Sequence, residues 1–200
     1  MSVADRQTPS SARRWPADDC RKPIADSRQP HVDRCGKIRM LVLDVDGVLT
    51  DGRIIYSEDG VETKAFHVRD GTGLKIWHEQ GLRTAIVTGR TSRAVEIRAA
   101  ELGIGAVVQG TADKLSACRR LLDESALGFD QVCGIGDDLP DLPVLSNCGL
   151  AVAVADACPE VRAAAHYVTH TPGGRGAVRE VIELILSCQG RWKFNMKNEK

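Results

Sequence analysis

Short apolar runs separated by longer polar or amphipathic segments divide the central part of the chain. The clearest runs cover residues 40–43, 83–87, 106–109 and 131–135, and shorter ones lie within 147–154 and at 167–169. Runs of this length without alternation are typical of strands buried on both faces of a parallel sheet. The segments between them predict helices over residues 74–80, 92–102, 113–123, 159–165 and 177–187. This alternation predicts an α/β fold in which helices flank a parallel sheet.

One insertion interrupts this alternation directly after the first strand. Two β-rich pieces, residues 53–56 and 61–68, flank the sequence Ser-Glu-Asp-Gly. An Asp-Gly pair between such pieces is a strong signal for a β-hairpin. Residues 69–73 read Arg-Asp-Gly-Thr-Gly and predict a loop that leads into the helix at 74–80.

The two ends of the chain differ from its centre. Residues 1–36 hold four of the eight prolines and have almost no apolar periodicity, so we expect a disordered extension. Residues 37–188 form the predicted domain, and residues 189–200 form a polar tail. No window approaches 18 apolar residues, so no membrane span is expected.

Charge and cysteine content narrow the partners and the compartment. Lys and Arg together number 27, as do Asp and Glu, so no basic excess points to nucleic acid. The seven cysteines have no paired CxxC spacing and are expected to be free thiols. These features favour a cytoplasmic protein without a nucleic-acid partner.

The first strand ends in two carboxylates. Asp44 and Asp46 lie two positions apart, so their side chains point to the same side, and Gly47 follows and permits a sharp turn. Ligands of open α/β sheets bind outside the carboxyl ends of strands. The two acids are therefore placed where a ligand is expected.

Later strand ends add the groups that phosphoryl transfer requires. Asp44 and Asp137 are oxygen ligands suited to Mg²⁺, and Asp44 is also a candidate nucleophile. Asp46 is the candidate general acid and base, while Lys114 neutralises phosphate charge. Further support comes from the Thr88 hydroxyl and the Gly89 N–H toward phosphate, and from Asp138 and Asp141 beside Asp137.

The order of these motifs resembles the haloacid dehalogenase-like superfamily. The matching stretches are DVDGVLTDG, TGR, Lys114 and GDDLPD, in a region from Ile38 to about Gly190. Receiver domains also use Asp, Thr and Lys around Mg²⁺, but in the reverse order. The resemblance implies a Rossmann-like core, and the acid at Asp46 resembles that of phosphatases and phosphomutases. Only 41 residues separate Asp46 from Thr88 and 25 separate Thr88 from Lys114, so we expect no cap domain.

Longer stretches resemble one capless family, the 3-deoxy-D-manno-octulosonate 8-phosphate phosphatases. They include LDVDGVLTDGRIIYSEDG, ETKAFHVRDGTG and GGRGAVREV. The resemblance implies a Mg²⁺-dependent homotetramer that hydrolyses a sugar-acid phosphate in lipopolysaccharide synthesis. It implies that Asp44, the Asp46 carbonyl and Asp137 hold Mg²⁺. The implied substrate residues are Asp46, His67, Val68, Arg69, Asp70, Gly71, Lys75, Gly89, Arg90, Arg98, Lys114 and Arg175.

Two of these arginines have separate arguments. A guanidinium at Arg90 suits the carboxylate of a sugar acid. The segment Gly173-Gly174-Arg175-Gly176 suggests either a flexible arm or a plain loop leading into the last helix. Its resemblance to the family tail favours the arm and implies that Arg175 reaches the substrate of a neighbouring subunit, in place of a cap. The expected hairpin would help to build that oligomer.

Two other functions stay open at this point. One is a phosphatase for a related nine-carbon sugar acid, which the same motifs would fit. The other is a non-catalytic tetramerising module, which the presence of Asp44, Asp46, Lys114 and Asp137 disfavours.

Overall fold

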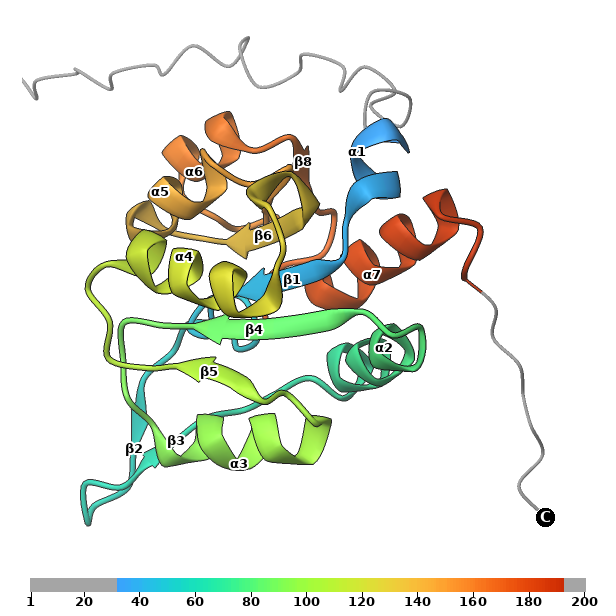
Figure 1. Ribbon diagram of the computed structural model, residues 1–200. Coiled ribbons are helices and arrows are strands. Elements are labelled where there is room, and N and C mark those ends of the chain that lie inside the picture. The colour runs from blue at the N-terminus through green and yellow to red at the C-terminus, as the bar shows by residue number, and fades with distance from the viewer. Residues whose placement is uncertain (1–31, 193–200) are drawn as a thin grey trace, which may run out of the picture.

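A computed structural model of the protein describes residues 32–192 (Figure 1). Its strands are β1 Met40–Leu43, β2 Ile55–Tyr56, β3 Glu62–Thr63, β4 Arg83–Val87, β5 Ala106–Val108, β6 Val132–Gly136, β7 Leu150–Ala153 and β8 Tyr167–Val168. Its helices are α1 Val32–Lys37, α2 Val68–Glu79, α3 Arg93–Leu102, α4 Lys114–Ser125, α5 Leu142–Leu145, α6 Pro159–Ala164 and α7 Ala177–Cys188. Two 3₁₀ turns, η1 Phe129–Gln131 and η2 Leu139–Asp141, flank β6.

Six strands form one parallel sheet in the order β5-β4-β1-β6-β7-β8, as the apolar runs predict. Strand β1 lies at the centre, and the chain adds β4 and β5 on one side before it adds β6, β7 and β8 on the other. The order therefore reverses between β1 and β6. Such a switch point opens a crevice at the carboxyl ends of the two strands, where ligands of α/β sheets bind.

Two groups of helices cover the faces of the sheet. Helix α7 packs against α1 and α2 on one face, while α4, α5 and α6 follow one another on the other face (Figure 1). All four residues of β1 and of β7 are buried, which explains their unbroken apolar sequence. Trp77 of α2 is fully buried, and its indole N–H donates to the carbonyl of Arg83 at 2.8 Å.

The hairpin forms where the Asp-Gly pair predicts it, with short arms. Ile55 pairs with Thr63, and Tyr56 pairs with Glu62, in an antiparallel ladder. Its outer residues are strongly exposed, with Tyr56 at 60% and Val61 at 63%. The hairpin and α2 fill the segment between Asp46 and Thr88, which confirms the absence of a cap domain within residues 32–192.

Helix α2 begins earlier than predicted. The expected strand over 61–68 is confirmed only at β3, and the expected loop over 69–73 is wrong, because the helix starts at Val68 and includes both glycines. Gly71 and Gly73 are there for close packing. A Cβ on Gly71 would lie 2.3 Å from the guanidinium of Arg98, and one on Gly73 would lie 2.9 Å from Cδ of Arg179.

Both expected domain boundaries fall inside packed structure. Helix α1 starts at Val32, within the expected extension, and its Cys35 is fully buried. Beyond residue 188, the Gln189 amide donates to the carbonyls of Cys35 and Ile38. The rest of the expected extension and tail lies outside the described residues. No helix within residues 32–192 is long and apolar enough to cross a membrane.

The glycine-rich segment before α7 is a packed loop and not a free arm. The Gly174 N–H donates to the Val48 carbonyl at 2.9 Å. A Cβ on Gly173 would lie only 1.7 Å from the carbonyl oxygen of Gly47. These glycines therefore let two backbone segments approach closely, and they do not form the flexible arm that was expected.

Candidate active site

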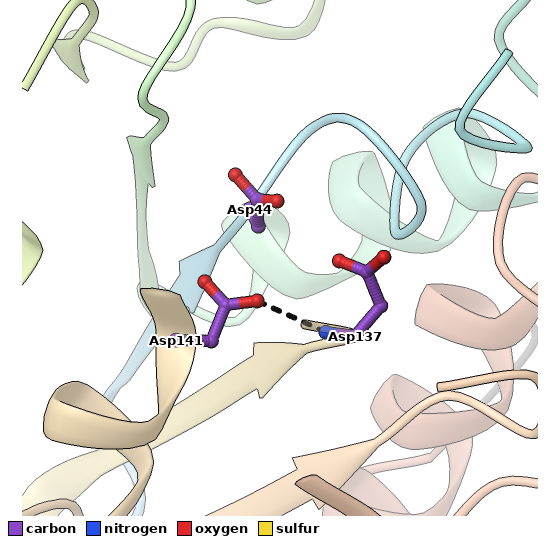
Figure 2. A group of neighbouring side chains, drawn as sticks. All are labelled: Asp44, Asp137 and Asp141. Carbon is purple, nitrogen blue, oxygen red and sulfur yellow. Dashed lines mark hydrogen bonds between the residues drawn. The ribbon is translucent and has the colours of Figure 1, made fainter. Parts of the chain in front are cut away.

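Three carboxylates converge at the switch point of the sheet (Figure 2). Asp44 follows β1, Asp137 follows β6, and Asp141 ends η2. Candidate ligand oxygens of the three lie within 4.8 Å of one another. The parallel order places these strand ends side by side, so residues more than 90 positions apart in the chain form one cluster.

Lys114 brings a single buried cation to this cluster. It opens α4, where the side chain of Asp113 caps the helix by accepting from the Ser116 N–H. Its ammonium donates to Asp141 at 2.7 Å and lies 2.8 Å from Oδ1 of Asp44. Burial alone would lower the pKa of Lys114, but these two carboxylates raise it, so the side chain stays charged.

Asp141 supports the cluster from behind. One of its oxygens accepts from Lys114, and the other accepts from the backbone N–H groups of Asp137 and Asp138 at 3.0 and 3.3 Å. Both oxygens are thus occupied by the protein. Asp138 itself is exposed. The contacts of Asp141 are those that a supporting residue would make, and the role of Asp138 stays a prediction.

Asp44 and Asp137 have the features of a cation site. Oδ1 of Asp137 is buried and has no hydrogen-bond partner, and the buried Oδ1 of Asp44 faces the Lys114 ammonium at 2.8 Å. Burial, with the nearby carboxylate of Asp44, raises the pKa of Asp137 to about 8. Burial, with the carboxylate of Asp141, also raises the pKa of Asp44 in spite of Lys114. Buried acids in this state gain from a bound cation, so the cluster fits a divalent metal ion.

Gly47 allows the loop after β1 to lie against this site. Its φ of 98° is in the left-handed region that favours glycine. A Cβ at this position would lie 2.0 Å from Oδ2 of Asp137. The glycine that follows the acid pair is therefore required by both the turn and the space, as the sequence indicates.

A second group of charges surrounds Asp46. Lys64 donates a short hydrogen bond to Oδ1 of Asp46, and Arg90 Nε lies 3.6 Å from Oδ2. Glu62 joins the two cations, because its Oε1 lies 2.6 Å from Arg90 and 3.5 Å from Lys64. The hydrogen bond from Arg90 lowers the pKa of Glu62. Tyr56 also accepts from Arg90 at 3.4 Å. We call Asp46, Glu62, Lys64 and Arg90 the outer cluster.

Thr88 and Gly89 lie at the end of β4, as predicted. Thr88 is buried, and its hydroxyl accepts from the Arg90 N–H at 3.5 Å. Gly89 is exposed. A Cβ on this residue would lie 3.7 Å from its nearest neighbouring atom, which is an ordinary contact distance.

The other predicted substrate residues make their contacts elsewhere in the single chain. Buried Asp70 accepts from the Arg179 N–H at 2.8 Å and so caps α7. His67 precedes α2, and its Nδ1 is buried without a partner. Arg98 lies over Phe66 at 5.9 Å and bonds Glu101.

The remaining members of that set are exposed, except for Gly71. Val68, Arg69 and Lys75 are exposed on α2, and Gly71 is buried beneath Arg98. Arg175 is 63% exposed and lies 3.9 Å from Asp51. Arg69 and Arg175 both line an open hollow of about 490 Å³ beside α7. Their roles in substrate binding stay predictions.

Sequence reasoning missed Lys64 and Glu62. Both come from the second arm of the hairpin, where residues two apart point to the same side. Glu62, Lys64 and Phe66 share this spacing; Lys64 contacts Asp46, and Glu62 contacts Lys64. That period was the available signal.

Comparison with known proteins places this geometry in a family. The model for haloacid dehalogenase-like hydrolases matches residues 95–182. The 3-deoxy-D-manno-octulosonate 8-phosphate phosphatase of Salmonella typhimurium is 50% identical over 81% of this chain and 87% of its own. The crystal structure of the same enzyme from Yersinia pestis is 48% identical, covers 84% of this chain and 89% of its own, and has a TM-score of 0.80.

A third relative is a crystal structure of the phosphatase from Moraxella catarrhalis, in complex with magnesium, phosphate and KDO. It is 44% identical, covers 82% of this chain and 94% of its own, and has a TM-score of 0.80. Sequence identity at this level over most of both chains indicates a common family and not only a shared fold. The chain therefore belongs to the haloacid dehalogenase-like hydrolases, within the family of 3-deoxy-D-manno-octulosonate 8-phosphate phosphatases.

Proposed function

We propose that the protein is a Mg²⁺-dependent phosphomonoesterase that hydrolyses 3-deoxy-D-manno-octulosonate 8-phosphate to the free sugar acid and phosphate. The observation that carries the proposal is the convergence of the buried carboxylate oxygens of Asp44 and Asp137 beside the ammonium of Lys114, with Oδ1 of Asp137 left without a hydrogen-bond partner. The names of the relatives support the substrate.

Asp44 is the proposed nucleophile. One of its oxygens attacks phosphorus, the bond from phosphorus to the sugar oxygen breaks, and a phosphoaspartate forms. Lys114, 2.8 Å from Asp44, offsets negative charge at the nucleophile. Thr88 and Gly89 are proposed to bind phosphate oxygens. Asp44, the Asp46 carbonyl and Asp137 would hold Mg²⁺, which when bound neutralises phosphate charge.

Asp46 is the proposed general acid and base. It gives a proton to the departing sugar oxygen in the first step. In the second step it takes a proton from the water that attacks the phosphoaspartate, which releases phosphate and restores Asp44. Its side chain is 18% exposed, so water and substrate can reach it.

Arg90 is the proposed partner of the substrate carboxylate. Its side chain is 42% exposed at the outer edge of the site. A guanidinium binds a carboxylate through two parallel hydrogen bonds, which suits a sugar acid. The remaining contacts proposed for the sugar come from His67 to Gly71, Lys75 and Arg98.

The lid and the assembly are part of the proposal. The exposed apolar residues of the hairpin, Ile54, Ile55, Tyr56 and Val61, support burial between subunits of a homotetramer. Arg175 is exposed and is proposed to reach the substrate of a neighbouring subunit. The six cysteines of the described region are free, in keeping with a cytoplasmic protein.

A panel of phosphate esters tests this function. The full chain is assayed with the eight-carbon and nine-carbon sugar-acid phosphates and with a small generic ester. We expect the highest kcat/KM for the eight-carbon substrate. Chelation should abolish turnover, Mg²⁺ should restore it, and Ca²⁺ should not, because Ca²⁺ prefers more ligands and looser geometry.

Asp44→Asn protein from the same preparation is the control for contaminating phosphatases. Full activity after exhaustive chelation would rule out the metal dependence. A clear preference for the nine-carbon substrate would replace the proposed substrate with its alternative.

A further inference from the structure

Lys64 is the most deeply buried cation of the outer cluster. Its side chain is 2% exposed, although it comes from a hairpin whose other face is open to solvent. A buried ammonium is costly unless it is paired and hydrogen-bonded. Here the pairing partners are Asp46, through a short hydrogen bond, and Glu62 at 3.5 Å.

The two carboxylate oxygens of Asp46 have different contacts. Oδ1 receives the direct hydrogen bond from Lys64. Oδ2 faces Arg90 at 3.6 Å, which is too long for a hydrogen bond. One oxygen is therefore fixed, while the other is free to exchange a proton with substrate or water.

Glu62 limits the freedom of Lys64 in turn. Its Oε1 contacts both Lys64 and Arg90, and it belongs to β3, which pairs with β2. The ammonium is thus held from two sides and cannot follow a moving carboxylate. Asp46 takes its orientation from the hairpin as well as from its own loop.

We propose that Lys64 is a positioning residue for proton transfer, which holds Oδ1 of Asp46 so that Oδ2 serves as the acid and base. The inference rests on the proposed function, because it assigns Lys64 to the same reaction. In the proposed reaction, Lys64 contacts neither the nucleophile nor the phosphate. It acts on the rate only through the carboxylate that it orients.

The role predicts a dependence on the leaving group. Glycerol phosphate releases an alkoxide that needs a proton from Asp46 as its bond to phosphorus breaks. 4-Nitrophenyl phosphate releases a stable phenolate that needs none. Since kcat/KM reports the steps up to departure of this group, disorder of Asp46 should affect the first substrate and spare the second.

Lys64→Met tests this in the full-length protein with Mg²⁺. We expect kcat/KM for glycerol phosphate to fall by about 10- to 100-fold, the effect of misplacing a catalytic group. The value for 4-nitrophenyl phosphate should fall by less than about 3-fold. Both substrates are measured on one preparation, so an unfolded fraction cancels in their ratio. Lys64→Arg should restore part of the loss.

Arg53→Met is the matched control, because Arg53 is an exposed cation of the same segment that pairs with Asp51 and not with Asp46. It should change neither value. A double-mutant cycle gives a second measurement. If Lys64 acts through Asp46, Lys64→Met should cost almost nothing more in an Asp46→Asn background.

Equal losses on both substrates, or full additivity in the cycle, would overturn the proposal and leave Lys64 a purely structural role. If Lys64→Met does not fold, Lys64→Gln carries the same comparison. Failure of both to fold while Arg53→Met folds would also assign Lys64 to structure. A wild-type protein inactive on every phosphate ester would refute the proposed function instead.

Discussion

Gly173→Ala is expected to disturb the catalytic loop from the far end of the chain. A Cβ at residue 173 would lie 1.7 Å from the carbonyl oxygen of Gly47 and 3.3 Å from the nitrogen of Val48. Both contacts are with backbone, which cannot rotate away as a long side chain can. The backbone at 173 has no positive φ, so the effect would come from space alone.

The size of the effect follows from that distance. Real Cβ contacts are essentially never below 3.0 Å, so the two segments would have to separate by about 1.3 Å. Overpacking of this kind costs about 1–3 kcal/mol and sometimes more. Because the contact can be relieved only by moving backbone, we expect about 3 kcal/mol, or a fall in Tm of about 6–12 °C for a domain of this size.

Activity should fall further than stability. Residues 44–47 carry the proposed nucleophile and the proposed general acid, and a displacement near 1 Å costs on the order of 10²-fold in rate. Thermal unfolding and kcat/KM are measured on Gly173→Ala beside Gly105→Ala, whose Cβ would meet nothing within 4 Å. A Gly173→Ala protein with wild-type Tm and wild-type rate would refute the close approach.

Three further predictions concern single side chains. Asp44→Asn should abolish turnover without loss of circular dichroism, and Asp46→Asn should cost about 10²–10⁴-fold; more than a tenth of wild-type activity in Asp44→Asn would exclude the phosphoaspartate. Arg175→Ala should lower kcat/KM more for the sugar-acid phosphate than for a generic ester, and equal losses, or a fully active monomer, would exclude the lid. Burial lowers the pKa of His78 from 6.5, so the unfolded chain binds its proton more readily. Stability should therefore decline as pH falls below 6.5, and the decline should be smaller in His78→Gln.

The sequence is sufficient to predict the sheet but not the boundaries of α2. Short apolar runs that alternate with helical segments, such as the run within residues 83–87, predict buried strands, and the structure confirms this one. Gly71 and Gly73 suggest a loop because glycine weakens isolated helices. In the fold they pack closely against Arg98 and Arg179, which lie on other helices. A tertiary reason of this kind leaves no local signal.

The candidate site also has residues whose position the sequence predicts and residues whose position it does not predict. Asp44 and Asp137 are predictable because parallel strand ends meet at one edge. The pairing of Lys114 with Asp141 is only partly predictable, because it depends on how α4 packs against η2. The period of two in the second hairpin arm places Glu62 and Lys64 on one side, but the outer cluster also depends on how the hairpin folds back over the loop after β1, which that period does not specify.

The division of charge between the two halves of the site has a kinetic consequence. In the outer cluster, two carboxylates face two cations. In the inner half of the site, the three carboxylates of Asp44, Asp137 and Asp141 face the ammonium of Lys114. A phosphate dianion that approached this inner half alone would be repelled, even with a proton on Asp137. Electroneutrality therefore imposes an order of addition, in which a divalent cation precedes the phosphate ester. Calorimetric titration with phosphate should give no heat of binding until the cation is present, and the order would be wrong if phosphate bound equally well without it.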